Sequence, residues 1–210
     1  MKILVAEDDP VCKRFLTGVL HRAGHRVIET SDGSELWDAY QTEPTNLVVT
    51  DWMMPRETGI EVCRKIREQP RDAYTYIIVV TSLSDGEHTL QGFRAGADEM
   101  VAKPFDAATL VQRVEMGARL VKRMVAQAEH GLRRSLDVLQ GALGHEDGRL
   151  LESVAELTDL YRGQRAFVKC RAFLRRQISI IESAYGPDDE RLRKLRDELA
   201  QLRNIDDAVY

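Results

Sequence analysis

The sequence predicts an α/β domain with a five-stranded, doubly wound parallel sheet, followed by an all-α domain of helical repeats. Over residues 1–119, short apolar runs that end in polar residues alternate with segments of helical spacing. This alternation is typical of a parallel sheet covered by helices on both faces. From about residue 120 no strand-like run occurs, and the chain repeats itself at an offset of 42 residues. We therefore expect two domains, residues 1–119 and residues 120–210.

Each predicted strand is a short apolar run, and each run is followed by a segment of different spacing. The expected strands lie at residues 3–6, 26–30, 47–50, 77–80 and 100–102. After the first run, Phe15, Leu16 and Val19 recur at helical spacing. Further helices are expected at residues 34–41, 59–68 and 87–95, and a last one after Asp106, a residue suited to capping a helix.

The repeat in the second half predicts pairs of helices joined by glycine-containing turns. Leu132-Arg133-Arg134 returns as Leu174-Arg175-Arg176, and the acidic turn that begins at Asp147 returns at Asp189. No linker rich in glycine or proline precedes this half, so the helix after Asp106 is expected to continue into it. The expected helices lie at residues 107–143, 148–162, 165–185 and 189–204.

Composition and charge limit the class of protein. The net charge is −4; residues 1–119 carry 14 Lys and Arg against 19 Asp and Glu, and residues 120–210 carry 16 against 15. The second half is too weakly basic to predict DNA binding, so no nucleic-acid partner is expected. Three cysteines without metal-ligand spacing indicate reduced thiols in a cytoplasmic protein. No signal peptide or membrane-spanning stretch is visible, so no membrane association is expected.

Polar side chains stand where the apolar runs end. Glu7 and Asp8 follow the first run, Asp51 ends the third, Thr81 follows the fourth, and Lys103 follows the fifth. Because the carboxyl ends of parallel strands share one edge of a sheet, these side chains are expected to meet there. Carboxylates bind Mg²⁺, and a bound cation shields a carboxylate nucleophile from the charge of an incoming phosphoryl group. The edge is therefore suited to metal-assisted phosphoryl transfer.

The motifs at this edge resemble the response-regulator receiver domain of two-component signalling, which has a flavodoxin-like fold, over residues 1–119. The resemblance rests on order and spacing: Glu7-Asp8-Asp9, Asp51 with Pro55 and Gly59, Thr81-Ser82, and Lys103-Pro104-Phe105.

The resemblance implies a role for each residue of the motifs. Asp51 is the implied acceptor of a phosphoryl group from a sensor histidine kinase, and Thr81 and Lys103 are the implied contacts of that group. The implied Mg²⁺ ligands are Glu7 through water, Asp8, Asp51 and the backbone carbonyl of Met53. No enzymatic activity is implied beyond Mg²⁺-dependent self-phosphorylation from a phosphodonor and self-dephosphorylation.

Some positions depart from the family pattern or allow two interpretations. Met100 occupies the switch position, where the family often has an aromatic residue that rotates inward. Met53 and Leu83 flank the implied path of the hydrolytic water, and because neither can orient water, we expect slow self-dephosphorylation. Asp9 either caps the helix that opens at Pro10 or supports the metal shell.

The second half resembles tetratricopeptide repeats of the kinesin-light-chain-like type. The resemblance rests on residues 154–164, on Phe167, Cys170 and Leu174, and on the turn at residues 186–189. A helical bundle or antiparallel coiled coil is the alternative. Either structure implies output through protein–protein interaction, with an unknown downstream protein or with a second copy in a homodimer.

Two other functions remain open. A DNA-binding transcription regulator would need a recognition helix and a basic surface in the second half. A phosphorelay protein could use His130, which opens a stretch faintly similar to the histidine box of sensor kinases, although the acidic residue that should follow it is missing.

Overall fold

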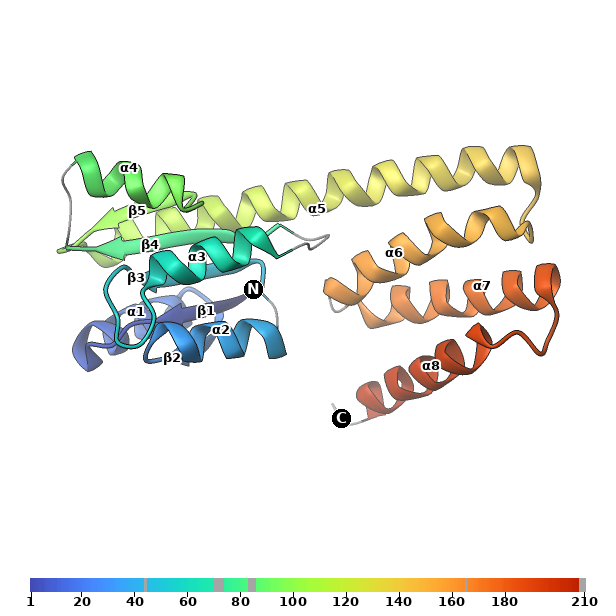
Figure 1. Ribbon diagram of the computed structural model, residues 1–210, viewed down its shortest axis with the longest axis horizontal. Coiled ribbons are helices and arrows are strands. Elements are labelled where there is room, and N and C mark those ends of the chain that lie inside the picture. Colours follow the sequence, from blue (N-terminus) through green and yellow to red (C-terminus); the bar gives the residue numbers. More distant parts are fainter. Residues whose placement is uncertain (44, 70–73, 83–85, 165, 208–210) are drawn as a thin grey trace. The chain divides into compact units, whose positions relative to one another are not determined.

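The computed structural model consists of two compact units (Figure 1). It describes residues 1–43, 45–69, 74–82, 86–164 and 166–207, with side chains as far as Leu202. The first unit covers Met1–Met124, and the second begins at Val125. The division falls within a single long helix, five residues beyond the domain border expected from the sequence.

The first unit contains the predicted five-stranded sheet, whose paired strands are all parallel. The sheet order is β2-β1-β3-β4-β5, which is a doubly wound arrangement. Every residue of β3 and β4 is buried, as the uninterrupted apolar runs require. The strands are β1 (Lys2–Ala6), β2 (Arg26–Thr30), β3 (Leu47–Asp51), β4 (Tyr76–Thr81) and β5 (Glu99–Ala102).

Helices connect the strands and cover the sheet. They are α1 (Pro10–Arg22), α2 (Gly33–Thr42), α3 (Gly59–Glu68), α4 (Gly86–Arg94) and α5 (Ala107–Leu143). The interpretation of Asp9 as a cap is confirmed, because its carboxylate accepts a hydrogen bond from Cys12 N–H at 2.7 Å, and support of the metal shell stays a prediction. Thr58 and Glu61 form a reciprocal capping box at the start of α3. Asp106 caps α5 by accepting from Thr109 N–H at 2.6 Å.

The second unit is helical throughout its described residues. It contains the end of α5, a short 3₁₀ helix η1 (Gly148–Leu150), α6 (Leu151–Gly163), α7 (Phe167–Tyr185) and α8 (Arg191–Asp207). Leucine side chains from α5, α6, α7 and α8 share one core with the fully buried Tyr161 and Cys170. The helical prediction is confirmed, whereas the tetratricopeptide character stays a prediction.

The sequence repeat returns as a repeated local structure. Asp147 accepts hydrogen bonds from the backbone N–H and the guanidinium of Arg149, and 42 residues later Asp189 accepts the same set from Arg191. Each of these two sets of hydrogen bonds closes the turn before the second helix of a pair. The predicted continuity of α5 is also confirmed, since it forms one helix of 37 residues. None of the described helices combines the length and the apolar character needed to cross a membrane.

Candidate functional site

The sheet places the predicted site residues at one edge. Asp51 is the last residue of β3 and pairs with Val80 of β4, and Thr81 pairs with Ala102 at the end of β5. Glu7 follows β1, which pairs with β3. Lys103 follows β5, and its backbone N–H donates to the carbonyl of Thr81 at 2.7 Å. The strand register alone therefore gathers these residues, as the sequence predicted.

Lys103 bridges the two buried carboxylates. Its ammonium Nζ lies 2.8 Å from Glu7 Oε2 and 3.0 Å from Asp51 Oδ2. The Glu7 side chain is fully buried, and that of Asp51 is 11% exposed. Burying a carboxylate is costly without a compensating cation, so Lys103 makes this arrangement of charge possible.

Asp51 is held at both of its carboxylate oxygens. Oδ2 accepts from Lys103, and Oδ1 accepts from the backbone N–H of Trp52 at 2.7 Å. The same N–H also lies 2.9 Å from the carbonyl of Val80, so it is shared between the site and the neighbouring strand. This geometry fixes the orientation of the carboxylate before any reaction partner arrives.

Three carboxylates converge at the edge. One oxygen from each of Glu7, Asp8 and Asp51 lies within 4.8 Å of the others, and Asp8 is the exposed member of the three. Hard oxygen donors at this separation match what Mg²⁺ prefers, and the three negative charges exceed the single ammonium of Lys103. The donor set therefore fits Mg²⁺, and Asp8 provides an approach from solvent.

The environment changes the acidity of both partners of the central ion pair. Burial raises the pKa of Asp51 to about 6, and the charge of Glu7 acts in the same direction against the hydrogen bond from Lys103. Burial works against the charged form of Lys103, but its hydrogen bonds to Glu7 and Asp51 outweigh burial and raise its pKa. At neutral pH the site therefore offers a carboxylate at Asp51 beside a stable ammonium.

The structure leaves the finer roles of some predicted residues as predictions. Thr81 is buried at the same edge, and the contact of its hydroxyl with a phosphoryl group stays a prediction. The side chain of Met53 is 58% exposed, and the role of its carbonyl toward Mg²⁺ also stays a prediction. Met100 is partly buried and packs against the core on the same face as Trp52. Leu83 lies outside the described residues.

Sequence reasoning missed one neighbour of the site. Cys12, one of the three cysteines without metal-ligand spacing, lies on the first turn of α1, where burial and a hydrogen bond with Glu7 raise the pKa of its thiol to about 12. The signal was available in retrospect, because helical spacing from the cap Asp9 directs residue 12 back toward the strand end. The thiol is therefore protonated at neutral pH and can donate to Glu7.

Comparisons with known proteins found similar sequences for the first unit. The family model described as "Response regulator receiver domain" matches residues 3–115. The chain is 32% identical over 130 residues to the "DNA-binding dual master transcriptional regulator RpaA" of Synechocystis sp., covering 61% of this chain and 54% of that protein. It is 32% identical over 117 residues to the "Chemotaxis protein CheY homolog" of Campylobacter jejuni, covering 55% of this chain and 90% of that protein.

A solved structure gives the same picture of the fold. The receiver domain of the Francisella response regulator 1452 superposes with a TM-score of 0.54 at 30% identity, covering 59% of this chain and 98% of that domain. The chain spans about half the length of several curated relatives that it matches, with coverages of 50%, 54% and 46%.

Proposed function

Because this chain belongs to the response regulator receiver domain family, we propose that it accepts a phosphoryl group on Asp51 from a sensor histidine kinase. The observation that carries the proposal is the bridge from the Lys103 ammonium to both Glu7 and Asp51, with Asp8 beside them. A structural ion pair would not need a third carboxylate at its solvent side. A phosphoryl-transfer site needs both the carboxylate nucleophile and the surplus of acidic ligands.

In the proposed transfer, an oxygen of Asp51 attacks the phosphorus atom of a phosphohistidine. The nitrogen–phosphorus bond breaks, its electron pair remains on the imidazole nitrogen, and an acyl phosphate forms on Asp51. Lys103 already contacts Oδ2 and can pair with an oxygen of the transferred group without crossing the site. Thr81 is the proposed hydroxyl donor to a second oxygen.

Glu7, Asp8, Asp51 and the carbonyl of Met53 are the residues that would hold Mg²⁺. When bound, this ion supplies the positive charge that lets a phosphoryl dianion approach a cluster of carboxylates. The chain's own residues hold the nucleophile in place, through Trp52 on one oxygen and Lys103 on the other. We propose no catalysis beyond self-phosphorylation from a donor and self-dephosphorylation.

Incubation with acetyl phosphate and Mg²⁺, followed by separation of phosphorylated from unmodified protein on a phosphate-affinity gel, tests the acceptor. Asp51→Asn should abolish the hydroxylamine-sensitive product, because an amide cannot form the acyl phosphate. Asp38→Asn, at an exposed position on α2, is the matched control and should react like the wild type. Equal labelling of wild type and Asp51→Asn would refute the assignment.

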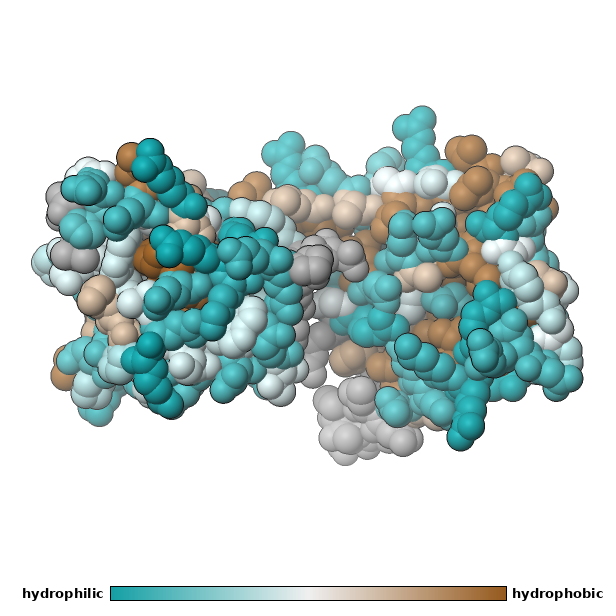
Figure 2. Space-filling view, in the orientation of Figure 1, coloured by the Kyte–Doolittle hydropathy of each residue, from teal (hydrophilic) through white to brown (hydrophobic). Residues whose placement is uncertain are grey.

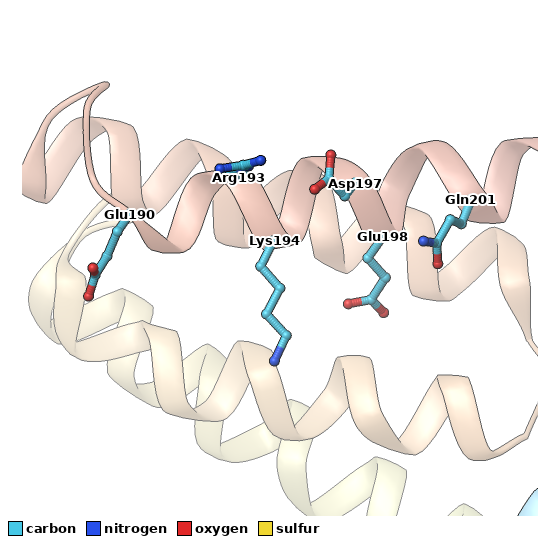
Figure 3. A pocket seen from close by; sticks show the side chains of 6 residues that line it. All are labelled: Glu190, Arg193, Lys194, Asp197, Glu198 and Gln201. Carbon is cyan, nitrogen blue, oxygen red and sulfur yellow. The ribbon is translucent and has the colours of Figure 1, made fainter.

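The helical unit is the proposed output region, acting through a downstream protein or through a homodimer. In the view of Figure 2, hydrophobic surface gathers over the helices of the second unit, whereas the sheet unit presents mostly hydrophilic atoms. A hollow of about 530 Å³ runs along α8, and Figure 3 shows Lys194 and Glu198 directed into it. Its lining carries charges of both signs and one neutral amide: Glu190, Arg193, Lys194, Asp197, Glu198 and Gln201. Such a lining suits a polar peptide or protein surface better than an apolar small molecule.

Phosphorylation can control this output only by favouring one of two states. The modified receiver unit must contact its surroundings differently in those states, and α5 is the covalent connection between the two units. Sizing chromatography with and without beryllofluoride and Mg²⁺ tests the homodimer directly. An unchanged elution volume would leave a downstream protein as the target of the output.

A second candidate function is DNA binding, which the expectation of no nucleic-acid partner had set aside. That expectation has no support from the comparisons, because a matched relative carries the name of a DNA-binding regulator. Arg171, Arg175 and Arg176 of α7 are the basic residues that such a role would use. Fluorescence anisotropy with random duplex DNA at low salt tests this function, and a steep loss of affinity with salt would support it.

Two smaller proposals remain from the sequence. His130 is exposed on α5, and an acid-labile label that persists in Asp51→Asn would establish a phosphorelay role for it. The free cysteines Cys12, Cys63 and Cys170 fit a reducing compartment, so we place the protein in the cytoplasm. Fractionation of cells that express a tagged chain tests that placement.

A further inference from the structure

The loop between β3 and α3 carries Met53, whose carbonyl is a proposed Mg²⁺ ligand. The loop is anchored at both ends, because Trp52 N–H lies 2.9 Å from the Val80 carbonyl and Gly59 N–H donates to the Trp52 carbonyl at 3.0 Å. A side chain at Gly59 would clash with the carbonyl of Asp51. The anchors fix where the loop begins and ends, and they leave its middle to other contacts.

Arg56 occupies the middle of this loop in an unusual backbone conformation. Its φ is 65°, which side chains other than glycine rarely adopt, and Arg56 is alone in this among the described residues that are not glycine. Glu57 N–H donates to the Pro55 carbonyl at 2.7 Å, which closes a three-residue turn around Arg56. Turns of this kind with positive φ are strained, and they persist only where neighbouring contacts enforce them.

The enforcing contacts come from the start of α2. The guanidinium of Arg56 forms an ion pair with Asp32 and lies 3.4 Å from Glu35 Oε1. Asp32 is itself fixed, because it is buried and its other oxygen accepts from Glu35 N–H at 2.9 Å as the cap of α2. The backbones also meet here, since a side chain at Gly33 would clash with the Glu57 carbonyl. The fixed carboxylate of Asp32 thus determines the position of Arg56 and of the turn around it.

We propose that Arg56 is a positioning residue for the metal site: by binding Asp32, it holds the strained turn and thereby sets the position of the loop that carries Met53, whose carbonyl is a proposed Mg²⁺ ligand. The proposal rests on the proposed function, since it assumes that the cluster binds Mg²⁺. The competing interpretation is a surface ion pair that only stabilises the fold, because the Arg56 side chain is 61% exposed. The two interpretations differ in what they predict for Mg²⁺ affinity.

Charge alone predicts the opposite result from positioning. Removing a positive charge from the surroundings of an acidic site should strengthen Mg²⁺ binding, if it has any effect. A weaker affinity after loss of Arg56 therefore cannot come from the lost charge. It must come from geometry, which makes the direction of the effect the decisive observation.

The experiment measures the Kd for Mg²⁺ of the unphosphorylated full chain through the fluorescence of Trp52, which is buried beside Asp51. Arg56→Ala and Arg56→Gly should each weaken binding about tenfold, the lower range for lost outer contacts of metal ligands. The Kd of Arg56→Lys should lie between that of wild type and that of Arg56→Ala, because an ammonium reaches one carboxylate but lacks the two parallel donors of the guanidinium. Arg64→Ala, at an exposed position on α3, is the matched control and should leave Kd unchanged.

Asp32→Asn tests the same contact from its other side. Asparagine still caps a helix but removes the charge, so α2 should remain folded while Mg²⁺ binding weakens. The lost negative charge also weakens binding by itself, so the test is the double variant and not this loss alone. In the double variant with Arg56→Ala, the two losses should not add, because both remove one interaction. Additive losses would show that the residues act separately and would overturn the proposal.

Three further outcomes are decisive. If Arg56→Ala and Arg56→Gly bind Mg²⁺ within about twofold of wild type while their thermal midpoints fall, Arg56 is only structural and the proposal fails. If Arg56→Gly binds like wild type and Arg56→Ala does not, the turn positions Met53 without the ion pair, which also overturns it. If the wild type itself binds no Mg²⁺, the proposed function fails, and this inference fails with it.

Discussion

The sulfur atom of Met100 fills the space that a side chain at Gly92 would need. A Cβ built on Gly92 would lie 2.5 Å from Met100 Sδ and 3.2 Å from the ring of Trp52. The ring of Trp52 also meets His88 of α4 edge-on, with 5.8 Å between the ring centroids. Met100 of β5, which stands where the family often has an aromatic switch, therefore packs its side chain against α4 beside Trp52, the residue that follows Asp51.

This packing predicts a non-additive pair of substitutions. Gly92→Ala should destabilise the protein that contains Met100, because the new methyl group displaces the thioether. In a Met100→Ala background the same change should cost less, since only the Trp52 ring at 3.2 Å still has to give way and alanine favours a helix by up to about 1 kcal/mol over glycine. Urea unfolding of the four proteins should give a coupling free energy on the order of 1 kcal/mol. If the changes in unfolding free energy of Gly92→Ala and Met100→Ala simply added, the contact between Met100 and position 92 would be contradicted.

Lys103 is expected to be the main stabiliser of the acidic edge. Lys103→Met should lower the free energy of unfolding by about 2–3 kcal/mol, near the lower end for a broken buried pair because this side chain is 22% exposed. Glu7→Gln in the same chain should recover part of the loss by removing one uncompensated charge. Chemical denaturation in EDTA measures both effects, and a Lys103→Met protein as stable as wild type would contradict them.

Millimolar Mg²⁺ gives a second test of the same pair. A bound cation replaces the lost ammonium near Glu7 and Asp51, so the deficit of Lys103→Met should shrink as Mg²⁺ is added. Arg113→Met, which removes an exposed ion pair with Glu99, is the control. Its small deficit should not respond to Mg²⁺.

The pKa of Asp51 predicts how the metal-free protein responds to pH. The folded value is about 6 against an ordinary value of 3.8, so between these values the folded state binds more protons than the unfolded state. The contribution of Asp51 to stability is therefore greatest below about pH 4 and is lost as the pH rises through about 6. A pKa that differs by about 2 between the folded and unfolded states changes the free energy of unfolding by about 3 kcal/mol.

The measurement is a difference between two proteins, because other carboxyl groups titrate in the same range. The free energy of unfolding of wild type minus that of Asp51→Asn, in EDTA, should fall between pH 4 and pH 7. A difference that is flat or that rises over this range would contradict the raised pKa. Asp38→Asn, at an exposed position on α2, is measured in parallel as the control for removing one surface carboxyl group.

The strand ends were predictable from the sequence, and the contacts between loops were not. Asp51, Glu7 and Lys103 each follow an apolar run, and parallel strands bring such positions to one edge whatever the intervening segments contain. No comparable rule predicts the ion pair between Arg56 and Asp32, because it depends on how two separate loops pack. Periodicity describes single elements, and it does not specify contacts between the turns that join them.

The same distinction holds elsewhere in the chain. The space for Met100 depends on the absence of a side chain at Gly92, a position that looks like any other in a helical pattern. In the second half, the 42-residue offset predicted the equivalent turns at Asp147 and Asp189 because a repeat compares the chain with itself. The helix pairs followed from this offset, whereas their packing depends on individual side chains.

One such side chain is Gln177, a large polar residue in the core of the second unit. It is 7% exposed and donates from Nε2 to Thr158 Oγ1 at 2.6 Å, linking α7 to α6 within the core. Gln177→Ala should destabilise the second unit by about 2–3 kcal/mol, through a cavity and the lost hydrogen bond. Loss of helical circular dichroism on heating measures this, and Gln201→Ala, on the exposed side of α8, is the control. If Gln177→Ala had the same thermal midpoint as wild type, the helices would be able to pack around a small residue at this position.

The lifetime of the acyl phosphate is expected to be long, because Met53 cannot orient a water molecule beside Asp51. Its side chain is 58% exposed, so a polar replacement can be introduced without disturbing the core. Met53→Asn should speed hydrolysis by at least about tenfold, since an amide can hydrogen-bond the attacking water. Met116→Asn, at an exposed position on α5, is the control and should leave the rate unchanged. Loss of label in buffer that contains Mg²⁺, after acetyl phosphate has been removed by desalting, measures the rates. A wild-type half-life of seconds, or an asparagine variant as slow as wild type, would show that another group controls access of water.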